Sequence, residues 1–246
     1  MLHYQPIVSL QPERSDGGAR GRIAHYEALL RLADEPDGSL VGPAVFLPAA
    51  ERYGLIRDID RMVLAKVTAL LADHGSGRAR AWPGPRIAIN LSGVSVTDGG
   101  MLEEIERRLA LAGADPTRLV IEVTETASIS DMERARAFCA AVQALGCAIA
   151  LDDFGAGFGS FQYLKHLPFR YLKIDGDFIR GLPGSMNDQL VVRALVGVVR
   201  GMGAETIAEF VGDEPTMRLL RSYGVDYAQG FYLGRPQPLA PLALCA

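Results

Sequence analysis

The chain has 246 residues, of which 49% are hydrophobic and 22% are charged, and its formal net charge is -4. This length suits one large α/β domain with a substantial core, and the composition excludes a chain that is disordered throughout. The acidic balance disfavours a protein that binds nucleic acid polymers through a general positive charge.

The cysteines and histidines form no metal-binding pattern. The three cysteines, Cys139, Cys147 and Cys245, contain no CxxC pair, which indicates a reduced compartment and excludes a zinc–thiolate site. The four histidines are scattered without ligand spacing. No apolar run is long enough to span a bilayer and no signal peptide is recognisable. We therefore expect a cytoplasmic domain without membrane insertion, either alone or as the cytoplasmic part of a larger, membrane-attached protein with regulatory domains.

Short apolar, β-branched segments alternate with longer segments of helical periodicity, which is typical of repeated βα units. Eight strands are predicted, the number that closes an α/β barrel. They are Tyr4–Val8, Arg22–Leu30, Arg86–Leu91, Leu119–Val123, Ala148–Leu151, Tyr171–Ile174, Glu205–Ala208 and Tyr227–Phe231.

Helices are predicted between these strands, with proline, aspartate and glycine at their ends. They are Pro43–Tyr53, Arg57–Asp73, Leu102–Ala112, Asp131–Leu145, Asn187–Met202 and Glu214–Ser222. The first two strands are joined by a polar, glycine-rich loop, Gln11–Gly21, and a loop that short favours an antiparallel pair. The sequence therefore predicts a single TIM-like (β/α)8 barrel domain over residues 1–246, with an irregular, antiparallel first strand.

Seven of the predicted strands carry a polar or acidic residue at or near the C-terminal end. These residues are Glu27, Asn90, Glu122, the Asp152–Asp153 pair, Lys173, Glu209 and Gln229. In α/β barrels the C-terminal rim is where active sites are assembled. Isolated buried carboxylates are costly, so several of them at one rim require cations between them.

Each residue also has a purely structural interpretation. Glu27 alone fits a surface strand residue, and Asn90 fits a turn cap. Two aspartates before a glycine, as at Asp152, form a common turn, and Lys173 fits a salt-bridged structural lysine. Taken together, these interpretations require the same coincidence at strand after strand, which favours a functional site.

The segment around Lys173 also predicts where its side chain points. Lys173 and Asp175 alternate with Leu172 and Ile174, so we expect both polar side chains on one strand face. The lysine would then point into the mouth of the barrel.

The ligand types define the chemistry that such a rim supports. Oxygen-rich sites without sulfur or imidazole suit hard ions such as Mg²⁺ or Mn²⁺. Two such ions can clamp a phosphodiester and acidify a water, and Asp152 is our candidate for the shared ligand. Lys173 would orient that water or neutralise developing charge. Arg31 would hold a phosphate oxygen, with an ordinary surface arginine as the alternative.

The same residues make the chain resemble the EAL-domain family of cyclic di-GMP phosphodiesterases, nearly end to end. The matching motifs are Tyr4-Gln-Pro-Ile-Val8, Glu27-Ala-Leu29 with Arg31, Phe46-Leu-Pro-Ala-Ala-Glu51, Asn90-Leu-Ser92, Glu122-Val-Thr-Glu125, Asp152-Asp-Phe-Gly155, Leu172-Lys-Ile-Asp175, Ala208-Glu-Phe-Val211 and Gln229-Gly-Phe. The resemblance implies a barrel with an antiparallel first strand. It also implies cleavage of cyclic di-GMP to linear pGpG with two Mg²⁺ or Mn²⁺ ions.

The resemblance also implies a role for each matching residue. Glu27, Asn90, Glu122 and Asp152 would hold one metal ion, and Asp152, Asp153 and Glu209 would serve the second. Lys173, Glu209 and Glu27 would form the catalytic set, with Lys173 at the attacking water. Gln5, Arg31, Asp175 and Gln229 would contact the substrate, and Gln229 would also support the site. Residues 155–160, beginning at Gly155 and anchored by Glu125, would couple contacts within a homodimer to the site.

One position departs from the family pattern. The family reads Ala-Glu-Gly-Val-Glu where this chain has Ala208-Glu-Phe-Val-Gly212, so Gly212 replaces the second acid. Because the metal-binding set is otherwise complete, the resemblance predicts activity. The alternatives are a catalytically silent cyclic di-GMP receptor that signals through partner contacts, and a glycoside hydrolase. Lys173 and Asn90 among the acids, and a single tryptophan, Trp82, argue against the sugar-cleaving enzyme.

Overall fold

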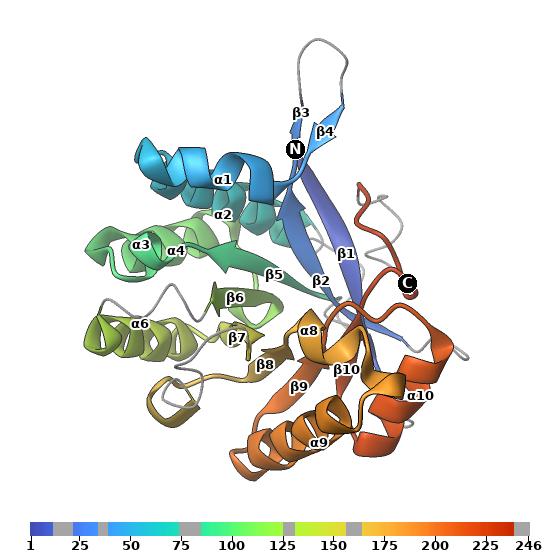
Figure 1. Cartoon of the computed structure of the whole chain (residues 1–246). Helices are drawn as coiled ribbons and strands as arrows, with labels where there is room; N and C mark the ends of the chain where they lie inside the picture. Colours follow the sequence, from blue (N-terminus) through green and yellow to red (C-terminus); the bar gives the residue numbers. More distant parts are fainter. Residues whose placement is uncertain (12–21, 34–38, 74–84, 125–130, 156–163, 239–246) are drawn as a thin grey trace.

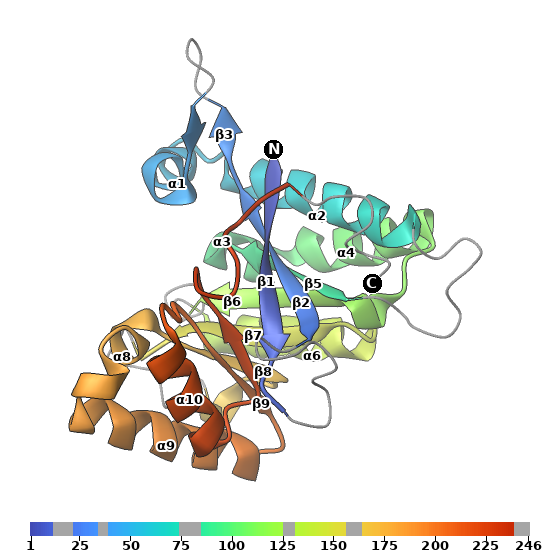
Figure 2. The same ribbon diagram turned by 90° about the vertical axis from the view of Figure 1, so that its right-hand side faces the viewer.

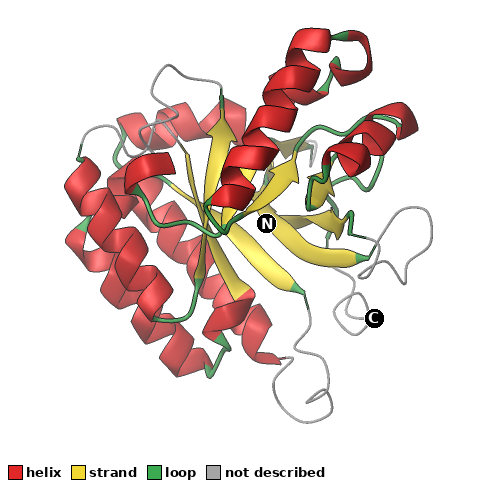
Figure 3. Ribbon diagram, turned by 90° about the horizontal axis from the view of Figure 1, so that it is seen from below, coloured by secondary structure: helices red, strands yellow, loops and turns green. Residues whose placement is uncertain are grey.

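The computed structural model describes residues 1–11, 22–33, 39–73, 85–124, 131–155 and 164–238. Eight of its strands form a closed barrel in the order β1-β10-β9-β8-β7-β6-β5-β2. Their bounds are β1 Leu2–Ser9, β2 Ile23–Leu30, β5 Arg86–Leu91, β6 Leu119–Thr124, β7 Ala148–Phe154, β8 Tyr171–Ile174, β9 Glu205–Ala208 and β10 Tyr227–Gln229. Figure 3 shows these strands gathered at the centre with the helices around them. The predicted TIM-like barrel is confirmed.

The first strand runs against its neighbours, as the short loop after it predicts. β1 pairs antiparallel with β2, with Gln5 opposite Glu27, and antiparallel with β10, with Ile7 opposite Gln229. The pairs from β2 through β5, β6, β7, β8 and β9 to β10 are parallel. The start of β1 therefore lies at the end of the barrel where the other strands finish.

Helices follow the strands and cover the barrel (Figure 2). The longer ones are α1 Pro43–Arg52, α2 Ile56–Asp73, α4 Gly99–Ala112, α6 Met132–Ala144, α9 Met186–Gly201 and α10 Glu214–Tyr223. The side chain of Asp131 caps α6, as predicted, by accepting a hydrogen bond from the backbone N–H of Arg134. Gly113 and Gly224 end α4 and α10 in the left-handed conformation that glycine tolerates best.

Several short elements were not predicted, because they are too short to show a period in the sequence. They are the β3 Leu32–Ala33 and β4 Leu40–Val41 hairpin, the helices α3 Gly93–Val96 and α8 Gly176–Ile179, and the 3₁₀ turns η3 Pro116–Arg118 and η4 Leu182–Gly184. The predicted Gln11–Gly21 loop lies outside the described residues except for Gln11. No helix in the described part of the chain is long and apolar enough to cross a membrane.

Two apolar layers hold the barrel together. The larger one lies between strands and helices and includes Leu64, Ile89 and Ile121, all fully buried. The smaller one includes Ile7, Tyr171 and Tyr227, which lie on the opposite face of the strands from the larger layer. These layers bury both faces of the sheet, which leaves the strand ends as the place where charged groups converge.

The last strand is two residues shorter than predicted and stops at Gln229, where Gly230 approaches the backbone of Val211. A Cβ atom added at Gly230 would overlap the backbone oxygen and nitrogen of Val211. Backbone atoms held in place by the hydrogen bond from Val211 N–H to Gln229 O, 3.0 Å, have little freedom to move away.

We therefore expect Gly230→Ala to lower the free energy of unfolding by about 1–3 kcal/mol, the cost of overpacking. Chemical denaturation measures this change. Gly181→Ala is the matched control, since a Cβ there meets no atom within 4 Å and the φ angle is -104°. Equal stabilities for the two variants would contradict this account of the strand end.

Candidate active site

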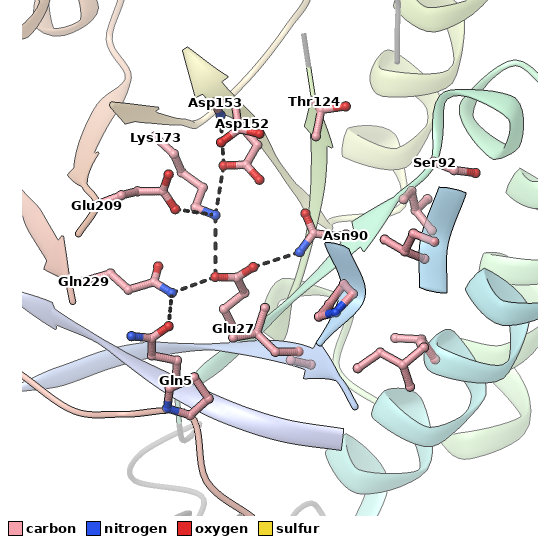
Figure 4. Close-up of a pocket in the computed structure, with 18 of the residues that line it drawn as sticks. Gln5, Glu27, Asn90, Ser92, Thr124, Asp152, Asp153, Lys173, Glu209 and Gln229 are labelled. Carbon is pink, nitrogen blue, oxygen red and sulfur yellow. Dashed lines mark hydrogen bonds and ion pairs between the residues drawn. The ribbon is translucent and has the colours of Figure 1, made fainter. Parts of the chain in front are cut away.

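A pocket of about 1180 Å³ opens at the carboxyl ends of the strands. Glu27 of β2, Asn90 of β5, Asp152 of β7 and Lys173 of β8 line it. Gln5 of β1, Gln229 of β10, and Asp153 and Glu209 at the ends of β7 and β9 also line it (Figure 4). Every predicted strand-end residue except Glu122 therefore lines one cavity.

Lys173 is the centre of the site. Its side chain is 1% exposed, and its Nζ lies 2.8 Å from Glu122 Oε2, 2.9 Å from Asp152 Oδ1 and 3.0 Å from Glu209 Oε1. Glu27 Oε2 is slightly farther from Nζ, at 3.6 Å. A buried ammonium on a rigid strand thus gathers carboxylates from four other strands or strand ends.

A second layer of amides orients Glu27. Asn90 Nδ2 donates to Glu27 Oε1 at 2.8 Å, and Gln229 Nε2 donates to Glu27 Oε2 at 2.6 Å. Gln229 Nε2 also donates to Gln5 Oε1, and Gln5 Nε2 donates to the backbone oxygen of Gly234. Both carboxylate oxygens of Glu27 are therefore held by neutral donors, and Figure 4 shows the chain of contacts.

The pKa values follow from burial and from the single lysine. Burial tends to lower the pKa of Lys173, but the surrounding carboxylates, Asp152 foremost, raise it well above its ordinary value. Burial also tends to raise the pKa of Glu27, but the Lys173 ammonium and the amide donors lower it overall. For Glu122, burial prevails over Lys173 and the pKa rises well above its usual range.

The pKa values of the Glu209 and Asp153 carboxyl groups are raised as well. Burial raises the pKa of Glu209 to about 8, against the opposing effect of Lys173 and with support from Asp152. Partial desolvation of its carboxyl group and the charge of Asp152 raise the pKa of Asp153 to about 6. One ammonium therefore does not compensate the acids that surround it.

This excess of negative charge fits a bound cation. Glu27, Glu122, Asp152, Asp153 and Glu209 together face one lysine. Oxygen atoms of Asp152, Asp153 and Glu209 lie within 4.8 Å of one another. Within the described residues, Glu122 Oε1 is buried without a hydrogen-bond partner. Oxygen-only donors of this kind suit Mg²⁺ or Mn²⁺.

The Asp152–Asp153 pair lines the pocket from a stretch of backbone with uncommon conformations. Asp153 has a φ angle of +54°, a conformation that side chains other than glycine adopt at a cost. The backbone N–H of Asp153 donates to Asp152 Oδ1 at 3.0 Å. Gly155 follows with a φ angle of +107°, and a Cβ there would overlap the ring of Phe178. Such a concentration of uncommon conformations is typical of functional sites.

We expect metal binding to release protons near neutral pH. Glu209, with a pKa of about 8, holds its proton at pH 7 in the metal-free protein and must lose it to ligate an ion. Metal affinity should therefore rise with pH up to about 8 and then level off. Calorimetric titration with Mn²⁺ in buffers of different ionisation enthalpy measures the released protons. Glu209→Gln should reduce the release, and heats that do not depend on the buffer would contradict the prediction.

Other predicted residues are placed differently. Arg31 lines the pocket, where its guanidinium donates to the backbone oxygen of Leu30 at 2.9 Å. Asp175 does not share a strand face with Lys173, and that prediction was wrong because β8 ends at Ile174. Its carboxylate instead caps α8 by accepting from the backbone N–H of Asp177. Glu125 and residues 156–160 lie outside the described residues, so their predicted roles stay predictions.

The structure also brings to the pocket two residues that the sequence did not single out, Asp60 and Arg180, each in contact with a residue of a matching motif. Asp60 of α2 accepts hydrogen bonds from the hydroxyl and the backbone N–H of Ser92, at 2.7 and 3.1 Å. Burial raises the pKa of Asp60. Phe210 has a φ angle of +53°, and its ring lies 4.1 Å from the guanidinium carbon of Arg180. Phenylalanine at the family's glycine position was the available signal for the contact with Arg180, whereas Asp60 is one of several polar residues on an amphipathic helix.

The fold and the site define an α/β-barrel protein with an acidic centre at its C-terminal rim that could hold a cation. The chain belongs to the EAL domain family, whose model matches residues 1–236. It is 39% identical over 240 residues to the cyclic di-GMP phosphodiesterase PdeB of Shewanella oneidensis, covering 98% of this chain and 27% of that protein. It is 37% identical over 222 residues to the cyclic di-GMP phosphodiesterase PdeF of Escherichia coli, covering 90% and 29%.

Solved structures agree with this assignment. The PaMucR phosphodiesterase in complex with c-di-GMP superimposes with a TM-score of 0.85 at 34% identity, covering 97% of this chain and 92% of that one. The EAL domain of Xanthomonas citri FimX in complex with c-di-GMP gives a TM-score of 0.83 at 31% identity, covering 97% and 88%. The chain spans less than a third of the length of the curated relatives PdeB and PdeF.

Proposed function

We propose that this chain is a metal-dependent phosphodiesterase that hydrolyses cyclic di-GMP to linear pGpG in the cytoplasm. The observation that carries the proposal is the convergence of four carboxylates on one buried lysine at the rim of an EAL barrel, with the carboxylate of Asp153 beside them. Similarity to proteins named cyclic di-GMP phosphodiesterases supports the choice of substrate. We further propose that residues 1–246 act as one domain, within a homodimer and joined to regulatory domains in a longer chain.

Two Mg²⁺ or Mn²⁺ ions would complete the site. Glu27, Asn90, Glu122 and Asp152 would hold one ion, and Asp152, Asp153 and Glu209 would hold the other. When bound, such ions supply Lewis-acid activation of a water and of the phosphodiester. The excess negative charge and the partnerless Glu122 Oε1 within the described part of the chain support this assignment.

The protein's own groups position the reactants. Lys173 is a fixed donor within reach of the carboxylates, so its ammonium would hold the attacking water and stabilise charge on the phosphoryl oxygens. Arg31 at the pocket wall would hold a phosphate oxygen. Gln229 and Gln5 would contact the substrate while keeping Glu27 in its orientation.

The second candidate is a receptor that binds cyclic di-GMP without cleaving it. Gly212 is the only motif position where the family's acid is replaced, and a Cβ there meets only the backbone oxygen of Phe210, at 4.0 Å. The carboxylates that surround Lys173 are all present, which favours hydrolysis over simple binding.

Following the ligand after binding separates the two candidates. Purified protein is incubated with cyclic di-GMP and Mg²⁺ or Mn²⁺, and the nucleotides are resolved by chromatography. We expect pGpG to accumulate over many turnovers. Tight binding with recovery of intact cyclic di-GMP would instead favour the receptor and direct attention to Gly212.

A further inference from the structure

Three ring-bearing side chains lie inside the barrel, one layer below the residues of the proposed active site. They are His25 of β2, Tyr171 of β8 and Tyr227 of β10, with exposed fractions of 1%, 0% and 2%. Side chains two positions apart share one face of a strand, so the three rings lie beneath residues that line the pocket. These residues are Glu27, Lys173 and Gln229.

The three rings contact one another across the interior of the barrel. Between ring centroids, His25 lies 4.8 Å from Tyr171 and 5.0 Å from Tyr227. The centroids of Tyr171 and Tyr227 are 5.9 Å apart, and the two rings meet edge to face. In the closed strand order, β2 and β8 lie on opposite sides of the barrel. Because these two strands are not neighbours in the described sheet, the contact between His25 and Tyr171 joins them directly.

The other half of the same layer consists of small side chains. The strands β5, β6 and β7 contribute Ala88, Val120 and Ala150, each at most 1% exposed. Protein interiors are close-packed, so the side chains that fill the barrel at this level set the distance between its walls. Replacing a ring by a smaller side chain leaves a space that the surrounding structure fills only in part.

The hydroxyl groups of the two tyrosines are anchored to one ion pair. Arg170 Nε donates to the hydroxyl oxygen of Tyr171 at 3.0 Å, and the hydroxyl of Tyr227 donates to Glu205 Oε1 at 3.1 Å. Arg170 Nη2 and Glu205 Oε2 lie 3.2 Å apart. The two rings are therefore held at their polar ends as well as by contact with each other and with His25.

We infer that the three rings form a cross-barrel spacer, which positions Glu27 against Lys173. Glu27 belongs to β2 and Lys173 to β8, the two opposite strands that the rings join, and Glu27 Oε2 lies 3.6 Å from Lys173 Nζ. Misplacement of reacting groups by about 1 Å costs about 100-fold in rate, so the spacing of these strands matters to catalysis. The inference rests on the proposed function, because it assigns positioning residues to the proposed hydrolysis.

Tyr171→Leu tests the spacer, because it removes one ring without burying a new polar group. We expect kcat for cyclic di-GMP to fall about tenfold or more while KM stays within about twofold, since Glu27 and Lys173 shift but the pocket walls remain. Tyr171→Phe keeps the ring and loses only the hydroxyl contact with Arg170, so its kcat should match the wild type. His25→Leu should reproduce the loss. The double Leu variant should be no slower than either single one, because the two rings act as one unit.

Leu109→Ala is the matched control for lost stability. Leu109 of α4 is 5% exposed, belongs to the larger apolar layer and lies outside the described pocket lining. This variant should lower the denaturation midpoint and leave kcat unchanged. Wild-type kcat in Tyr171→Leu, or losses that multiply in the double variant, would overturn the inference. If circular dichroism shows Tyr171→Leu unfolded, a folded His25→Leu with wild-type kcat would overturn it equally.

Crystal structures of the metal-free variants separate this inference from the proposed function. The distance between Lys173 Nζ and Glu27 Oε2, 3.6 Å in the wild type, should change by about 1 Å in a folded Leu variant and stay the same in Tyr171→Phe. An unchanged distance in the Leu variants would overturn the spacer even if the wild type is active. A changed distance in a chain that forms no pGpG would support the spacer and refute only the proposed hydrolysis.

Discussion

Asp152→Asn is expected to lower kcat/KM for cyclic di-GMP on the order of 10³-fold or more, because it removes a ligand assigned to both metal ions. Asparagine keeps the size of the side chain and can still accept the hydrogen bond from the backbone N–H of Asp153. The fold should therefore persist while the negative charge that the cations require is reduced. Steady-state kinetics with Mn²⁺, together with thermal unfolding of the same preparation, measure both effects.

Glu106→Gln is the control for this change, since Glu106 is an exposed carboxylate of α4. It makes the same chemical substitution far from the pocket lining and should leave kcat/KM unchanged. Glu27→Gln, which also removes an assigned metal ligand, should reproduce the loss. Wild-type rates in the Asp152 variant would refute the assignment of this residue to the metal centre.

Lys173→Met is expected to abolish most turnover and to destabilise the metal-free protein by about 3–5 kcal/mol, the cost of removing one partner from a buried ion pair. The lysine is 1% exposed and compensates carboxylates at 2.8, 2.9 and 3.0 Å. Without it, the remaining acids repel one another unless they bind protons or cations. Mn²⁺ should therefore raise the unfolding temperature of the variant more than that of the wild type.

The decisive outcome for Lys173 is the combination of lost turnover with retained metal binding. Denaturant unfolding with and without Mn²⁺ measures stability, and calorimetry measures metal affinity. Lys165→Met is the control, because Lys165 is exposed and should change neither quantity. Loss of the metal site in the Lys173 variant would show that the lysine holds the carboxylates in place rather than acting on the substrate.

Most of the barrel could be predicted because its strands and long helices have clear hydrophobic periods. The eight predicted strands all occur, and polar residues that end apolar runs, such as Asn90 and Asp152, meet around one pocket. Parallel strands bring their carboxyl ends to the same rim, so the convergence follows from topology. The residues of the rim could therefore be predicted from their residue types and their positions in the strands.

What escaped prediction depends on contacts between distant segments. Asp175 lies one residue past a strand end, and only the start of α8 decides that its carboxylate caps a helix. The overlap that makes Gly230 necessary arises with Val211, nineteen positions earlier in the chain. Phe210 adopts a left-handed backbone in the turn after β9, and Gly176 leaves room for its ring. Periodicity carries no information about such pairs.

The most direct test of the proposed function is the formation of pGpG from cyclic di-GMP by the purified chain, first stripped of metal with EDTA and then supplied with Mg²⁺ or Mn²⁺. We expect no product in EDTA and sustained turnover when either ion is restored. Equal rates with and without EDTA would contradict a metal-dependent centre, and the absence of product with both ions would contradict the phosphodiesterase itself.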